Sequence, residues 1–156
     1  MMIEYFFIAV LGAVLGSFLN VLILRAREGM TILGRSQCPH CYIKLRPQHL
    51  VPIVSWLLLR GRCAACRRPI HIQYPLVELS SAVLLILAYI RHPFFSQSEI
   101  WPLFMLESAL LLGLLAFVVF DLRWKLLPIE PIIILSVLAV IGNIALSQLT
   151  WTSVLL

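Results

Sequence analysis

The residues best suited to chemistry in this 156-residue chain are four cysteines, arranged as two CxxC pairs with 21 residues between them. Each CxxC turn directs two sulfurs at one ion, and two such turns complete the tetrahedral four-thiolate set of a structural zinc site. The spacing therefore predicts one zinc ion per chain, held by Cys38, Cys41, Cys63 and Cys66. Because four thiolates leave no open position for water, this ion would organise the chain around it and take no part in catalysis.

Other uses of the same cysteines stay open at this point. In an oxidising compartment they would form two disulfides, and a CxxC pair can also be redox-active. His40 lies inside the first pair. With four thiolates available, we interpret His40 as a surface side chain and not as a fifth ligand.

Four carboxylates lie within or at the edge of apolar segments, and such groups are candidates for function because their burial in a membrane is costly. We expect water to reach Glu4, and we expect Glu107 to form a buried hydrogen bond with a neighbouring helix. Asp121 follows one apolar run and Glu78 begins another. These two side chains are predicted to share a depth in the membrane and could approach each other.

The composition places the elements that carry these residues in a bilayer. Hydrophobic residues make up 62% of the chain and charged residues only 12%, which is far from the balance of a soluble domain. We predict an all-α integral membrane protein with about four spans, at residues 3–24, 75–90, 102–120 and 131–149. The domains would be a first helix (1–24), a basic loop with the zinc module (25–74) and a membrane domain with three helices and Asp121 (75–156).

The basic residues predict how the chain is oriented. Nine of the twelve lysines and arginines lie between residues 25 and 74, where Glu28 is the one acid. By the positive-inside rule this loop is cytoplasmic, the N-terminus lies outside, and the thiols are reduced. Zinc knuckles can bind RNA, but the lipid bilayer on both sides of the loop favours anionic lipid or an acidic substrate segment as its electrostatic partner. We expect no nucleic acid.

Small residues recur at helical spacing along the first predicted span. They are Ala9, Gly12, Ala13, Gly16, Ser17 and Asn20. Such a stripe allows another helix to approach closely. Asn20 is polar and near the membrane edge. We expect it either to pack against the neighbouring helix, like the rest of the stripe, or to contact a substrate.

Several motifs follow one another along the chain. They are Gly16–Val21 (GSFLNV), Arg35–Cys38 (RSQC), Pro52–Cys63 (PIVSWLLLRGRC) and Tyr74–Leu79 (YPLVEL). In this order they resemble the N-terminal half of type IV prepilin peptidases. The resemblance covers residues from about 10 to 131, with the two cysteine pairs between its motifs.

This resemblance implies an aspartic endopeptidase of the bacterial inner membrane that removes the leader peptides of type IV prepilins and type II secretion pseudopilins at the cytoplasmic face. Members of the family commonly also N-methylate the new N-terminus with S-adenosylmethionine. The family uses two aspartates. The first precedes an aliphatic residue and a proline, a pattern that Asp121 fits with Leu127-Pro128; the second belongs to a GxGD motif in the C-terminal half.

This chain contains no GxGD motif. Hydrolysis by carboxylates needs one ionised group to activate water and one protonated group to donate a proton, so one aspartate cannot do both. We therefore expect an incomplete peptidase, in which Glu78, Glu130, a second chain or a C-terminal half supplies the other carboxylate. The alternatives are a catalytically inactive membrane scaffold that binds leader peptides or secretion-machinery partners, and a zinc-ribbon adaptor unrelated to pilins.

Overall fold

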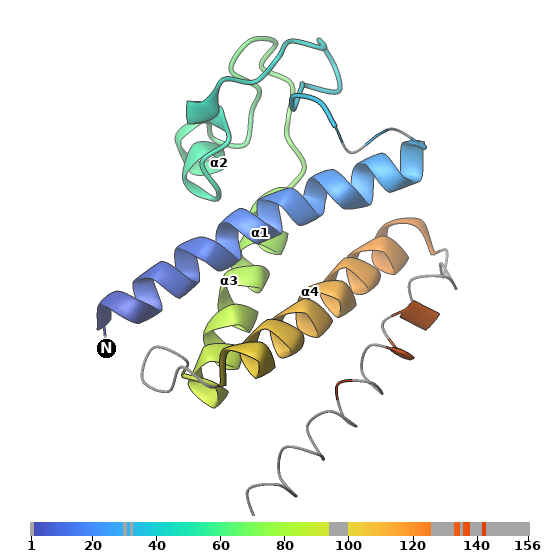
Figure 1. The fold of residues 1–156 in the computed structure, drawn as a ribbon. Helices are drawn as coiled ribbons and strands as arrows, with labels where there is room; N and C mark the ends of the chain where they lie inside the picture. The colour runs from blue at the N-terminus through green and yellow to red at the C-terminus, as the bar shows by residue number, and fades with distance from the viewer. Residues whose placement is uncertain are drawn as a thin grey trace, which may run out of the picture.

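The protein is all-helical in the part of the chain that the structure, a computed structural model, describes: residues 2–29, 31, 33–93, 100–125, 133, 134, 136, 137 and 142. The elements are α1 (Met2–Glu28), the 3₁₀ helix η1 (Pro47–His49), α2 (Val54–Leu58), α3 (Gln73–Arg91) and α4 (Trp101–Trp124), as Figure 1 shows. Three of them, α1, α3 and α4, are long and apolar enough to cross a membrane. The predicted helical membrane fold is confirmed for these spans, and the predicted run at 131–149 lies almost wholly outside the described residues.

The three long helices expose most of their apolar surface. The most apolar 18-residue windows of α1, α3 and α4 are only 28%, 44% and 11% buried inside the protein. In water such surfaces would be unstable, whereas in a bilayer they face hydrocarbon.

Two helices continue four residues past the predicted ends of their spans. Helix α1 continues four residues past Leu24 to Glu28, and α4 continues past Phe120 to Trp124. Basic residues such as Arg25 and Arg123 in the last turn interact favourably with the negative end of the helix dipole, which helps the helices to continue. Lys125 caps the C-terminal end of α4: its backbone is left-handed (φ 51°), and its N–H donates to the carbonyl of Asp121 at 2.7 Å. Asp121 therefore lies in the last turn of α4.

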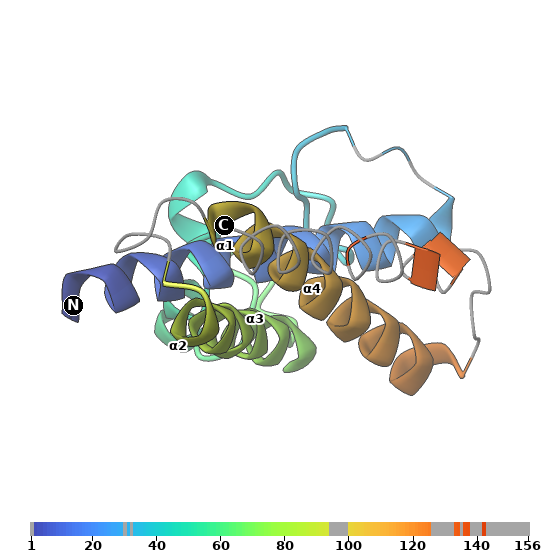
Figure 2. The same cartoon turned by 60° about the horizontal axis from the view of Figure 1, so that its bottom comes forward.

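Helices α1 and α3 cross in contact at the predicted small-residue stripe (Figures 1 and 2). A Cβ atom added to Gly12 would lie 2.6 Å from the Cα of Ala82, and one added to Gly16 would lie 2.8 Å from the Cα of Glu78. Both separations are shorter than any ordinary carbon contact. The prediction of a close helix approach is confirmed, because only glycine lets the two backbones come this near.

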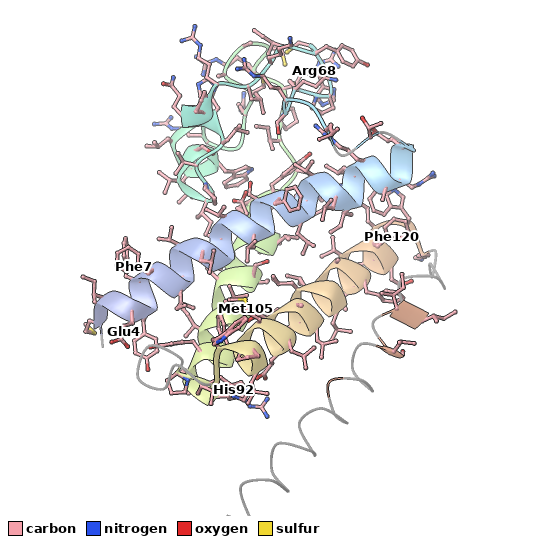
Figure 3. All side chains as sticks on the ribbon, viewed as in Figure 1. Glu4, Phe7, Arg68, His92, Met105 and Phe120 are labelled. Atoms are coloured by element: carbon pink, nitrogen blue, oxygen red, sulfur yellow. The ribbon has the colours of Figure 1, made fainter. Side chains whose placement is uncertain are left out.

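At the other end of α3, polar side chains join the three helices. The Tyr89 hydroxyl donates to Glu4 Oε2 at 2.7 Å. The Glu107 carboxylate of α4 pairs with Arg91 at 2.8 Å and with His92 at 2.9 Å. Glu107 thus binds the end of a neighbouring helix as predicted, but its bond to Arg91 is exposed and not buried. Glu4, expected to be solvated, is part-exposed and bonded to Tyr89. Figure 3 shows Glu4 and His92 at the same end of the helices.

Candidate metal centre and membrane carboxylates

Each CxxC pair lies in a turn with the same backbone hydrogen bonds. In the first turn, the Cys38 N–H donates to the Ile43 carbonyl at 3.1 Å, and the Tyr42 N–H donates to the Cys38 carbonyl at 2.9 Å. The second turn, 25 residues later, repeats this pattern. The Cys63 N–H donates to the Arg68 carbonyl at 2.9 Å, and the Arg67 N–H donates to the Cys63 carbonyl at 3.1 Å. The spacing of the cysteines is visible in the sequence, whereas this repeat of the backbone hydrogen bonds is visible only in the structure.

Isolated antiparallel bridges flank both turns, Gln37 with Lys44 and Arg62 with Pro69. The residue after the second cysteine has a positive φ in each turn, 56° at Tyr42 and 60° at Arg67. This conformation costs a non-glycine residue on the order of 1 kcal/mol. Since both turns adopt this left-handed conformation, we infer that it helps each turn to direct its two sulfurs at the same point.

The four sulfurs have the separations that a tetrahedral ion requires. All four Sγ atoms lie within 4.8 Å of one another, and those of Cys38 and Cys66, which come from different pairs, are 3.9 Å apart. With zinc–sulfur bonds of about 2.3 Å, the sulfurs of a tetrahedral site lie about 3.8 Å apart. All four cysteines are free thiols, and 3.9 Å is far longer than a disulfide bond. The donor set therefore fits one metal ion.

The surroundings of the thiols favour unequal protonation. Backbone N–H groups of Cys66 and Ala65 donate to the Cys63 sulfur and lower its pKa to about 7. The Arg68 N–H lowers the pKa of Cys66, but burial and hydrogen bonds with the other thiols outweigh it and raise that pKa to about 11. Because metal ligands must be thiolates, binding of an ion here would release protons.

His40 is exposed and lies outside the sulfur cluster, as predicted. Its Nδ1 atom is 3.4 Å from the guanidinium of Arg68. Figure 3 shows Arg68 on the side of the loop that faces away from the helices.

The Glu78 carboxylate joins the cysteine loop to the membrane helices. Its Oε2 atom accepts the Ile53 N–H at 2.7 Å, and the side chain is buried. Ile53 has φ 61° and ψ −53°, and it is the central residue of a three-residue turn closed by a hydrogen bond from the Val54 N–H to the Pro52 carbonyl. This is the rare, strained form of γ-turn, and a β-branched residue is unusual there. Glu78 thus accepts the N–H of a strained residue at the start of α2.

Asp121 is part-exposed in the last turn of α4. A carboxylate at this end of a helix faces the negative end of the dipole, which is unfavourable by about 0.3–1 kcal/mol. Among the described residues Asp121 forms no ion pair, and no hydrogen bond joins it to Glu78. The approach of Asp121 to Glu78 therefore stays a prediction, and Glu130 lies outside the described residues.

Three polar side chains connect α1, α3 and α4 near Asp121. Asn20 is 1% exposed and donates to the Tyr74 carbonyl at 3.2 Å. Gln73 donates to the Asn20 Oδ1 at 3.3 Å and accepts a hydrogen bond from Arg123. Asn20 therefore packs between helices, as the first of its two predicted roles required. Nothing in the local sequence of Gln73 and Arg123 sets them apart from other polar residues at helix ends, so their contact was not predicted.

Comparison with known proteins gives these residues a family context. The family model described as Bacterial Peptidase A24 N-terminal domain matches residues 10–92, which include all four cysteines and Glu78. A prepilin leader peptidase/N-methyltransferase from Myxococcus xanthus is 41% identical over 142 residues, covering 90% of this chain and 39% of the relative. One from Stutzerimonas stutzeri is 34% identical, covering 86% of this chain and 53% of the relative.

A third relative, from Escherichia coli, is a type 4 prepilin-like proteins leader peptide-processing enzyme; it is 37% identical over 58% of this chain and 38% of the relative. This chain thus spans between about a third and a half of the length of such relatives. An alignment that covers 90% of 156 residues necessarily includes Asp121. No solved structure matches the chain. The matched domain and these relatives show that the chain belongs to the prepilin leader peptidase/N-methyltransferase family, of which it carries the A24 N-terminal domain.

Proposed function

We propose that this chain provides the N-terminal part of a leader peptidase that cleaves prepilins or pseudopilins, with Asp121 as one of two catalytic carboxylates. The observation that carries the proposal is the match of residues 10–92 to the A24 N-terminal domain. In this chain the matched domain is followed by Asp121, in the last turn of a helix long and apolar enough to cross a membrane. Asp121 is part-exposed there. A peptide at the membrane surface could therefore reach it.

The chemistry requires a second carboxylate close to the first. Two carboxyl groups that share a site have pKa values pushed apart, so one is ionised and activates water while the other is protonated and donates to the leaving amine. Glu78 accepts the Ile53 N–H, and it stays a candidate for assistance. We propose that the second catalytic group is an aspartate of a GxGD motif outside these 156 residues, on a C-terminal half or a second chain.

The proposed location is the bacterial inner membrane, with the four-cysteine loop and Asp121 on the cytoplasmic side. The distribution of basic residues supports this orientation. A membrane-impermeant thiol reagent applied to intact cells should label Ser96→Cys. It should leave Gln48→Cys unlabelled until the membrane is opened, and the reverse pattern would contradict the orientation.

The cysteine cluster is proposed to hold a structural zinc ion, since the sulfur separations suit it. The ion would stabilise the cytoplasmic loop, and Cys38, Cys41, Cys63 and Cys66 would be its ligands. N-methylation with S-adenosylmethionine is implied by family resemblance, and none of the described contacts adds support to it.

Cleavage of a tagged prepilin tests the proposed activity. Expressed alone, the chain should leave the substrate uncut because Asp121 has no second catalytic aspartate beside it. Expressed with a C-terminal half that bears GxGD, it should release the leader, which mass spectrometry of the substrate would detect.

The outcomes separate the two functions that remain. A complex that assembles and binds the leader without cutting it would favour the inactive scaffold. Robust cleavage by the 156 residues alone would contradict the need for a second aspartate and would point to Glu78 or Glu130.

A further inference from the structure

One edge of the cysteine loop combines exposed apolar side chains with arginines. Val54, Leu57 and Leu58 of α2 are 50%, 61% and 78% exposed. A cavity of about 480 Å³ opens beside them, lined by Leu58, Leu59, Arg60, Arg62 and Arg67. We call the side chains of Val54, Leu57, Leu58, Arg60, Arg62 and Arg67 the Leu–Arg edge.

Helix α2 is fixed so that this edge faces outward. Trp56 donates its Nε1–H to the Ile70 carbonyl at 3.3 Å, and its ring packs over Gly61, where an added Cβ would lie 2.8 Å from it. Trp56 therefore faces the interior of the loop. Leu57 and Leu58, the next two residues, are left on the surface.

The same helix is held at the depth of the membrane spans. The bond from Ile53 to Glu78 places the start of α2 beside a residue of α3 that itself packs on Gly16, in the middle of α1. Gly16 lies eight residues before Leu24, where the predicted span ends, which is about 12 Å along the helix. Figure 1 likewise shows α2 over the middle of α1 and not beyond its end. Exposed leucines at this level meet lipid before they meet bulk water.

The charge of the edge complements an anionic bilayer surface. Residues 29–77 contain seven lysines and arginines and no aspartate or glutamate. Within the described part of the chain, Arg60, Arg62 and Arg67 form no ion pair. A phosphate group is the natural partner of such a cluster, because guanidinium groups bind phosphate through paired hydrogen bonds.

We propose that the Leu–Arg edge is an interfacial lipid site: Val54, Leu57 and Leu58 enter the acyl region of the bilayer, and Arg60, Arg62 and Arg67 hold the headgroup phosphate of an anionic phospholipid. The amphipathic edge and its depth are what interfacial segments require. This site does not depend on the proposed peptidase activity.

The test uses the full chain in lipid nanodiscs made of phosphatidylcholine alone or mixed with phosphatidylglycerol. Amide hydrogen exchange of α2 should slow by at least about tenfold when phosphatidylglycerol is present. Native mass spectrometry should detect retained phosphatidylglycerol. The triple variant Arg60→Gln, Arg62→Gln and Arg67→Gln should weaken that retention about 100-fold.

A matched variant controls for net charge. Arg35→Gln, Lys44→Gln and Arg46→Gln removes the same charge from exposed positions of the same loop, and it should keep the lipid. Equal loss in both triple variants would overturn the site, because simple attraction to the charged loop would then suffice. Slow exchange of α2 in both bilayers would also overturn the site, because the protection would then need no anionic lipid. Protection only after a leader peptide is added would overturn it as well and would identify the peptide as the occupant.

Discussion

Asp121→Asn should abolish leader cleavage by the chain assembled with a GxGD-bearing half, with a loss of at least about a thousandfold. Asparagine keeps the size of the side chain but can neither activate water nor carry a shared proton, and removal of a general acid or base costs about 10²–10⁴ in rate. Assembly and leader binding should persist, since Asp121 forms no ion pair within the described residues. The measurement is the rate of substrate cleavage together with co-purification of the two halves.

Two other carboxylate substitutions make this result interpretable. Glu107→Gln removes a charge from the opposite end of α4, about 21 Å from Asp121, and should leave cleavage within about tenfold of the starting rate. Glu78→Gln keeps an oxygen that can accept the Ile53 N–H. If Glu78 only anchors α2, this variant retains activity, whereas loss of activity in a folded variant would give Glu78 a role in proton transfer. Full activity of Asp121→Asn would contradict the proposed function.

Cys63→Ser should reduce the bound zinc from one ion per chain to almost none and release the cysteine loop. Structural zinc contributes about 10–16 kcal/mol at pH 7 in small peptides, where metal binding and folding are one event. Cys63 is 2% exposed and accepts two backbone N–H groups, so a serine there removes a ligand and leaves an ill-suited hydroxyl in its place. Elemental analysis of the purified protein and limited proteolysis of residues 29–72 measure the two effects.

His40→Ala is the matched control, because His40 lies inside the first CxxC pair but outside the sulfur cluster. It should keep the metal and the resistance to protease. The long helices should survive Cys63→Ser, since the contacts of α1 with α3 at Gly12 and Gly16 do not involve the loop. Intact disulfides in the native membrane, or protein without zinc that still resists protease, would exclude the proposed metal site.

The sequence by itself determined the features that depend on near neighbours along the chain. Runs of apolar residues predicted the three described spans, and the stripe that includes Gly12 and Gly16 predicted a close helix approach. The two CxxC pairs predicted a four-sulfur cluster. These features can be predicted because a membrane span has a typical length, a helical face has a fixed period and a metal-binding turn has a fixed spacing of its cysteines. The motifs likewise indicated the family.

The tertiary structure decided how distant segments meet. Ile53 contacts Glu78 across 25 residues and Gln73 contacts Asn20 across 53, so neither bond has a local pattern. The bond between Ile53 and Glu78 gives the Glu78 carboxylate a structural role, because it holds the start of α2 against α3. In the proposed lipid site, this contact places the Leu–Arg edge at the bilayer. Such contacts depend on the rotation and depth of each helix, and these are set by how closely the backbones of α1 and α3 pack.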